Sequence, residues 1–145
     1  MDKKRYSELV KEKSPNSDTL KDLLKAFLVG GGICAFGEVM FEAFVYFGLQ
    51  EKQGRTLVSL SLILIASVLT MTGVFPKIAK FAGAGTLVPI TGFANAVTSA
   101  AIEFKSEGFV LGMGAKMFTI AGPVIVYGTV ASVVYGIIYW ITTLF

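Results

Sequence analysis

The chain has 145 residues, of which 54% are hydrophobic and only 16% are charged, and its mean hydropathy is +0.69. This balance is too apolar for a water-soluble domain of that length, so it indicates an integral membrane protein. The sequence has no histidine and one cysteine, Cys34, which excludes an intrachain disulfide framework, a Cys/His metal site and a histidine-based triad. No nucleophile with a base and no phosphate loop can be assembled, so we expect no enzymatic activity and no cofactor.

A polar head, residues 1–25, precedes the first long apolar run. It holds seven of the 13 Lys/Arg and five of the ten Asp/Glu, so the formal charge of +3 gives no argument for nucleic acid binding. Apolar residues recur at helical spacing before and after a break at residues 14–17, which predicts two amphipathic helices along a membrane surface. The basic residues before the first span predict a cytoplasmic N-terminus.

Two apolar runs follow, and each has the length of a membrane span. Residues 26–49 would form a helix of roughly 36 Å, which crosses a bilayer with some tilt. Residues 56–75 contain no charged side chain and end at Pro76 and Lys77. Between the two runs, residues 50–55 form a short polar turn.

The amino-acid composition changes in residues 83–104, where Gly, Ala, Thr, Ser and Asn mix with apolar residues around Pro89 and Gly92. Irregular backbone at membrane depth is tolerated only where it is buried in protein or lines a wet cavity. We therefore expect a broken or re-entrant helix here. The alternative is a kinked but otherwise ordinary span that is packed by small residues.

The last apolar stretch, from Phe109 to the C-terminus, is too long for a single span. Gly122-Pro123 is the natural break, which predicts a short segment at 109–121 and a full span at 123–144. In the last span small residues recur every fourth position, a spacing that allows close helix contact: Gly128, Ser132 and Gly136. The predicted fold is an all-α integral membrane protein of four or five hydrophobic helical segments, too small to enclose a wide pore without oligomerising.

The first candidate functional residues are Glu38 and Glu42, one helical turn apart within the first span. An ionised carboxylate at that depth costs several kcal/mol unless it is paired or hydrated. Both residues are therefore candidates for a solute path, a cation site or a proton site. The alternative is that they pair structurally with groups on a neighbouring span.

A second group of candidates surrounds the two Gly/Pro-interrupted segments, where half-helix ends can aim N–H groups or carbonyls at a solute. Gly and Pro also serve packing in membrane helices, so this group is an interpretation with an open alternative. Its members are Thr86, Pro89, Thr91, Gly92, Asn95, Lys116, Thr119, Gly122 and Pro123.

Three stretches carry a resemblance to a known family: FAGAGTLVPITGFAN at 81–95, AIEFKSEGF at 101–109 and GAKMFTIAGPV at 114–124. With them, the chain closely resembles the SpoVA family over essentially its whole length, and its charged head fits the AC type of subunit better than the AEb type. The resemblance implies a multi-pass subunit of a spore inner-membrane complex. That complex moves dipicolinic acid, as its calcium chelate, into the forespore during sporulation and out during germination.

The resemblance also implies partners, namely an AEb-type membrane subunit and a soluble, dipicolinate-binding AD-type subunit. It carries no residue-level motif, so the site assignments rest on membrane physics alone. Glu38 and Glu42 would repel free dipicolinate and fit better with a neutral calcium chelate, with a calcium path, or with a gate away from the solute. Two alternative functions stay open: a non-conducting scaffold subunit and a tension-gated channel.

Overall fold

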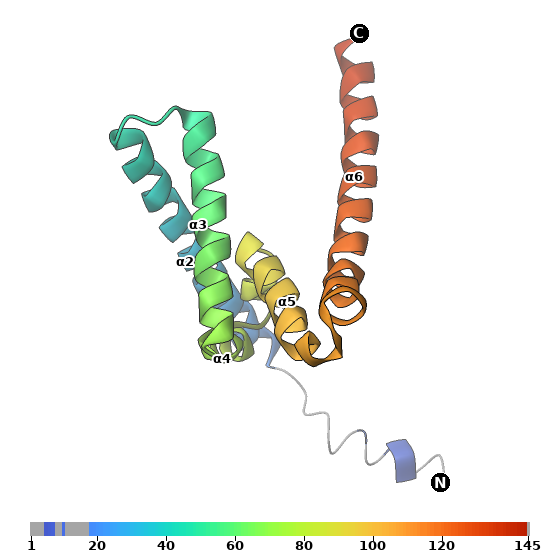
Figure 1. The fold of residues 1–145 in the computed structure, drawn as a ribbon. Helices are drawn as coiled ribbons and strands as arrows, with labels where there is room; N and C mark the ends of the chain where they lie inside the picture. The colour runs from blue at the N-terminus through green and yellow to red at the C-terminus, as the bar shows by residue number, and fades with distance from the viewer. Residues whose placement is uncertain (1–4, 8–9, 11–17, 145) are drawn as a thin grey trace.

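The computed structural model describes residues 5–7, 10 and 18–144, and every regular element in these residues is a helix (Figure 1). Three helices are long and apolar enough to cross a membrane: Thr19–Tyr46, Glu51–Met71 and Phe109–Thr143. The predicted all-α membrane fold is therefore confirmed. The elements in chain order are α2 (Thr19–Tyr46), α3 (Glu51–Met71), α4 (Val74–Ala82), η1 (Gly83–Thr86), α5 (Ile90–Glu103), η2 (Lys105–Glu107), η3 (Phe109–Gly114, a π-helix) and α6 (Ala115–Thr143).

Helix α2 begins at Thr19, so the second helix of the predicted head and the first predicted span are one continuous element. The reason is that no proline interrupts the chain after Asp18, and the change from polar to apolar residues near Ala26 does not disturb a helical backbone. The first head helix, residues 1–13, and the break at 14–17 lie largely outside the described residues.

Helices α2 and α3 form an antiparallel hairpin through the turn at residues 47–50 (Figure 1). Two glycines let large side chains of the opposite helix approach closely. A Cβ atom on Gly37 would lie 3.5 Å from Leu62, and one on Gly54 would lie 3.2 Å from the ring of Phe41. Both glycines are buried, so the hairpin is held by small-against-large packing, which is the usual means of contact between membrane helices.

Helix α3 ends at Met71, four residues before the predicted end at Phe75. Gly73 follows with a φ of 71°, a left-handed conformation that stops the helix at little cost for glycine. The new helix α4 accepts Pro76 because the proline lies in its first turn, where the missing N–H has no intrahelical partner to lose.

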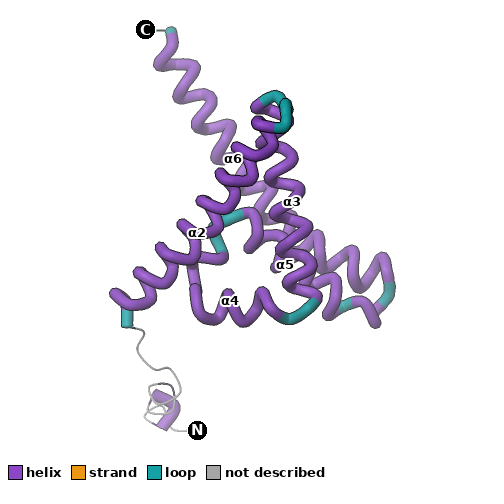
Figure 2. Tube along the Cα trace, turned by 90° about the vertical axis from the view of Figure 1, so that its left-hand side faces the viewer, coloured by secondary structure: helices purple, strands orange, loops and turns teal. Residues whose placement is uncertain are grey.

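Residues 74–103 form a helix–bend–helix unit beneath and between the long helices. Helix α4 runs across the base of the α2–α3 hairpin (Figure 2), and α5 begins part-way up the molecule and descends to the same end as α4 (Figure 1). With 14 residues, α5 is about 21 Å long, which is too short to cross a bilayer of about 30 Å. The predicted interruption is present at residues 87–89, between η1 and α5, while a re-entrant path through the bilayer stays a prediction.

The predicted division of the last stretch at Gly122-Pro123 is wrong, because α6 is continuous through Pro123. A proline inside a long helix removes one hydrogen bond, to the carbonyl of residue 119, and the remaining turns keep the helix intact. The chain breaks instead at Gly108, whose φ is 102°, and the π-helical turn η3 then leads directly into α6.

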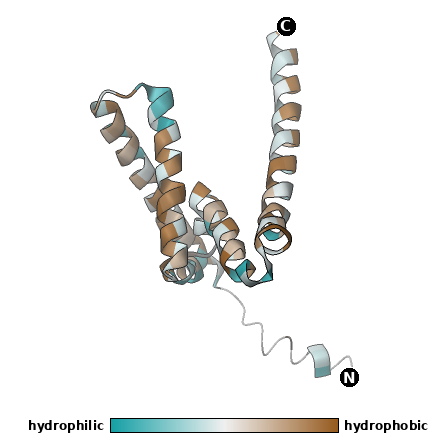
Figure 3. Cartoon of the chain, in the orientation of Figure 1, coloured by the Kyte–Doolittle hydropathy of each residue, from teal (hydrophilic) through white to brown (hydrophobic). Residues whose placement is uncertain are grey.

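Helix α6 stands apart from the α2–α3 hairpin and contacts α5 and η3 at its lower end (Figure 1). No residue of α6 is buried within the described chain. Hydrophilic colour is concentrated at the start of α3 and at the turn between α5 and α6, whereas the long helices are mostly apolar (Figure 3). The apolar surface of α6 is therefore left for lipid or for another subunit.

Candidate functional site

Helix α5 is fastened to α3 by hydrogen bonds between side chains. The buried Thr70 hydroxyl shares its proton between the carbonyl oxygen of Ala66 at 2.7 Å and the side-chain oxygen of Asn95 at 2.9 Å. One turn further along α5, the Thr98 hydroxyl lies 3.1 Å from the Ser67 hydroxyl. Asn95 was predicted as a solute contact, and the structure places it in this interhelix contact.

The bend, residues 83–89, is held by direct backbone contact between η1 and α2. A Cβ atom on Gly85 would lie 2.8 Å from the Cα atom of Ala26, and a Cβ atom on Gly30 would lie 3.0 Å from the carbonyl oxygen of Gly85. Gly92 packs within the bend itself, because a Cβ atom there would meet the carbonyl oxygens of Thr86 and Leu87. Gly30 and Gly85 therefore fix the position of the bend against α2.

The predicted bend residues have different environments. Thr86 is 1% exposed, and its hydroxyl donates to the carbonyl oxygen of Gly83 at 3.1 Å. Pro89 has an extended backbone and directly precedes the first turn of α5. Thr91 is 5% exposed, and its hydroxyl has no hydrogen-bond partner in the part of the chain that the structure describes. A buried hydroxyl without a partner costs about 1–3 kcal/mol, so Thr91 lowers the stability of this segment unless another group meets its hydroxyl.

Thr91 lines a cavity of about 330 Å³ between α2, α3 and α4. The rest of the lining is apolar and includes Val29, Ile33, Leu69 and Phe75. The cavity therefore offers one hydroxyl in otherwise apolar surroundings, an arrangement that suits a small and mostly apolar group.

A larger groove of about 440 Å³ lies between α2 and α3, and it brings together groups of opposite charge. Glu38 and Phe41 contribute from α2, Arg55 contributes from α3, and Pro89 contributes from the bend. The central carbon of the Arg55 guanidinium lies 4.4 Å from the centroid of the Phe41 ring, in a cation–π contact. This groove is the candidate functional site.

The structure separates the two carboxylates that look equivalent in the sequence. Both are exposed in the described chain, but Glu38 lines the groove, whereas Glu42, one turn later on α2, lies outside its lining. Arg55 was missed because the sequence places it in a polar turn. Since α3 begins at Glu51, Arg55 already lies in the second turn and meets α2. The signal available in the sequence was the small Gly54 beside a cation, which permits the contact with Phe41.

The second group of predicted residues is divided between two places. Lys116, Thr119, Gly122 and Pro123 lie on the first half of α6 and line neither cavity. The ammonium group of Lys116 lies 4.6 Å from the centroid of the Phe104 ring, and the Thr119 hydroxyl donates within its own helix at 2.8 Å. The structure therefore does not bring these four residues together with Glu38 or Thr91.

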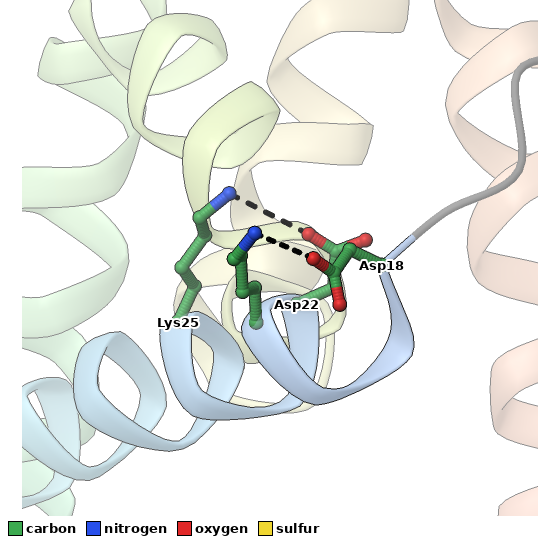
Figure 4. Close-up of polar contacts among 4 residues, drawn as sticks. Asp18, Asp22 and Lys25 are labelled. Carbon is green, nitrogen blue, oxygen red and sulfur yellow. Dashed lines mark hydrogen bonds and ion pairs between the residues drawn. The ribbon is translucent and has the colours of Figure 1, made fainter.

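Charged side chains gather where α2 begins (Figure 4). Lys21 pairs with Asp18 at 2.7 Å and Lys25 pairs with Asp22 at 3.5 Å, while Lys25 also lies 5.5 Å from the centroid of the Phe81 ring of α4. These side chains are largely exposed, so each pair contributes about 0–1 kcal/mol. Their main effect is to keep this end of the hairpin polar.

These features define a helical membrane protein with an interrupted segment, from α4 to α5, between its second and third long helices. Residues 22–138 match the model of the family described as SpoVAC/SpoVAEB sporulation membrane protein, and the chain belongs to this family. It is similar to stage V sporulation protein AC of Bacillus subtilis (strain 168), with 45% identity over 137 residues that cover 94% of this chain and 91% of that protein. No solved structure matches the chain. The resemblance seen in the sequence is confirmed, and the chain is a sporulation membrane protein.

Proposed function

We propose that the chain is a subunit of a channel or transporter in the inner membrane of the forespore and spore. Its solute is dipicolinic acid as the calcium chelate, which enters the forespore during sporulation and leaves during germination. The proposal assigns the chain no catalytic activity and no cofactor. Membership of a family of sporulation membrane proteins supports the setting, and the groove between α2 and α3 supports a role in solute passage.

The main support for the proposal is that the bend and two charged side chains line the same groove. Pro89 lies at the bend and lines the groove together with Glu38 and Arg55. Ionisable side chains within membrane spans are rare, and they typically mark solute or ion pathways. Broken backbone at membrane depth serves the same role in transporters, because it frees main-chain groups for the solute.

The distribution of basic residues supports a cytoplasmic N-terminal side. Lys21 and Lys25 lie at the start of α2, and Lys77 and Lys80 lie on α4, which runs across the same end of the hairpin (Figure 2). An excess of lysine on one side marks the cytoplasmic face of a membrane protein. In this orientation α2, α3 and α6 cross the bilayer, and the turn at residues 47–50 faces the opposite side.

The proposed partners are an AEb-type membrane subunit and an AD-type soluble subunit that binds dipicolinate. A single chain of this size cannot enclose a wide pore, and α6 buries no residue against the described chain. Assembly with further copies or with partner subunits would cover that helix and complete the path. The small residues Gly128, Ser132 and Gly136 are the proposed contact on α6.

A second candidate function is a non-conducting scaffold for the same complex. The observation that favours it is again α6, because its stripe of small residues has no contact partner in the described chain. A Cβ atom on Gly128 or on Gly136 would meet nothing within 4 Å, and the Ser132 hydroxyl bonds only to its own helix at 2.8 Å. A helix of this kind can recruit another subunit without lining a path.

The deciding experiment is dipicolinate flux, in the presence of calcium, through liposomes that contain this chain alone or with its membrane partner. Glu38→Gln with Glu42→Gln and, separately, Lys116→Met would be compared with the wild type. Flux that falls in the carboxylate variants would support a solute path in this chain. Flux that needs the partner and is indifferent to all these changes would support the scaffold.

A further inference from the structure

We propose that the groove between α2 and α3 is a binding site for a small molecule that carries a carboxylate and a positive centre close together. In this site Arg55 binds the carboxylate and Glu38 binds the positive centre. The inference rests on the proposed function, because the calcium of the dipicolinate chelate supplies the positive centre. It goes further by assigning the recognition of that solute to two residues.

Arg55 lies in the groove without a carboxylate partner among the described residues. Its guanidinium lies against the Phe41 ring, with 4.4 Å between the central carbon and the ring centroid, and it makes no ion pair within residues 5–7, 10 and 18–144. A guanidinium that rests on an aromatic face keeps the N–H groups of its edge free. Those groups match the two oxygens of a carboxylate in a bidentate contact.

Glycine at position 54 makes the Arg55 geometry possible. A Cβ atom at Gly54 would lie only 3.2 Å from the Phe41 ring, so a larger residue would push the ring away from α3. The ring then fixes the direction of the guanidinium, which reduces the side-chain entropy that Arg55 would lose on binding. The Arg55 guanidinium is therefore preorganised for ligand binding.

Glu38 lines the same groove, and it forms no ion pair with Arg55 or with any other described cation. Both side chains are exposed, so water can solvate each of them, but a ligand that carries both charges can contact the two side chains at once. A free dicarboxylate would meet repulsion from Glu38. A molecule with a bound cation would meet attraction at both ends.

A bare metal ion is a poor fit for this groove. Among the described residues there is no group of three or more acidic, cysteine or histidine side chains that could hold a metal ion. Calcium takes six to eight oxygen ligands, and one glutamate supplies at most two of them. In the chelate, the ring nitrogen and two carboxylate oxygens of dipicolinate already bind the calcium, so Glu38 has fewer positions to fill than at a bare ion, and the groove fits the chelate better.

Cys34 provides a reporter for occupancy that requires no mutation. It is the only cysteine of the chain, it is exposed, and it lines the same groove as Glu38 and Arg55. A ligand in the groove would shield its thiol from a small, water-soluble maleimide. The measurement is the rate of Cys34 alkylation in the purified full chain, with calcium dipicolinate, calcium-free dipicolinate or calcium alone as the probe.

We expect calcium dipicolinate to slow alkylation strongly and calcium alone to leave the rate unchanged. Arg55→Gln should raise the half-protective concentration of both dipicolinate probes by about tenfold or more, because a hydrogen-bonded charge contact is lost. Glu38→Gln should weaken protection by the chelate and improve protection by calcium-free dipicolinate. This opposite response separates charge recognition from a general disturbance of the groove.

The matched controls are Lys52→Gln and Glu51→Gln, which remove the same charges from α3 outside the lining of the groove. In both variants calcium dipicolinate should protect Cys34 from alkylation as strongly as it does in the wild type. Arg55→Lys keeps the charge without the planar fork and should give intermediate protection, which guards against a folding defect in Arg55→Gln. Protection that is equal in Arg55→Gln, Glu38→Gln and wild type would overturn the assignment.

The same variants in the liposome assay separate this inference from the proposed function. Wild-type flux that is unchanged by Arg55→Gln, together with unchanged protection, would keep the transport role and refute the groove. Protection that depends on Arg55 and Glu38 without any flux, alone or with the partner, would keep the binding site and refute transport by this chain.

Discussion

A Cβ atom on Gly85 would lie 2.8 Å from the Cα atom of Ala26, so the bend touches α2 backbone to backbone. No side chain fits between the two segments. This contact holds the bend against α2, and Pro89, four residues further along the bend, lines the charged groove. The position of the bend is therefore set by the absence of a side chain at one residue.

We expect Gly85→Ala to destabilise the protein by about 1–3 kcal/mol, because the new methyl group forces the bend away from α2. Thermal unfolding in detergent, followed by the loss of the monodisperse peak in size-exclusion chromatography, measures this effect. Gly31→Ala is the matched control, since a Cβ atom at Gly31 meets nothing within 4 Å. A stability loss that is equal in both variants would refute the role of the contact.

The Thr70–Asn95 hydrogen bond is expected to contribute about 1 kcal/mol of coupling between α3 and α5, which is typical of such contacts within membranes. A double-mutant cycle with Thr70→Val and Asn95→Leu measures it. Thr72→Val serves as a control, because the Thr72 hydroxyl bonds only to carbonyls of its own helix at 3.1 Å. Additive effects of Thr70→Val and Asn95→Leu would show that the two side chains are not coupled.

Thr91→Val should separate stability from transport. The substitution removes a buried hydroxyl without a partner, so we expect a gain of about 1 kcal/mol in the free energy of unfolding. If the hydroxyl meets the solute, dipicolinate flux should fall in the same variant. Thr98→Val is the comparison, because it breaks the contact with Ser67 and should lose stability instead. A loss of stability in Thr91→Val would show that the hydroxyl has a partner.

Pro123→Ala is expected to leave the fold unchanged and to stabilise α6 slightly, because the restored N–H can donate to the carbonyl of residue 119. Circular dichroism and thermal unfolding in detergent measure both effects. Pro89→Ala gives the contrast, since Pro89 lies at a real break, with an extended backbone before α5. A marked loss of helix content in Pro123→Ala would contradict a continuous α6.

The long helices and the bend could be predicted from the sequence because their signals are local. Uninterrupted apolar runs predict α2 and α3, and Pro89 with Gly92 predicts the break before α5. The division at Pro123 was wrong because a long membrane helix tolerates an internal proline although it removes one hydrogen bond and crowds the carbonyl of residue 119, whereas Gly108 adopts a φ of 102° that no helix allows. That conformation is not readable from the residue type alone.

The groove could be predicted only in part, because it depends on the register of the α2–α3 hairpin. Glu38 and Glu42 are equivalent in the sequence, and only the packing against α3 decides that Glu38 lines the groove. Arg55 was missed for the same reason, since its contact with Phe41 joins residues of two helices. Lys116 carries a positive charge that would suit an anionic solute, but it lies on α6 outside both cavities.

The stripe on α6 makes a prediction about assembly. Gly128→Leu and Gly136→Leu should leave the stability of the isolated chain nearly unchanged, because a Cβ atom at either position meets nothing within 4 Å. The same changes should reduce the recovery of the complex with the membrane partner, since a leucine prevents close helix contact. Val130→Leu, on the opposite face of α6, controls for added bulk and should permit full recovery. Co-purification from membranes that contain both subunits measures the outcome. Equal recovery in all three variants would show that this stripe faces lipid, and the contact between subunits would then have to involve another helix.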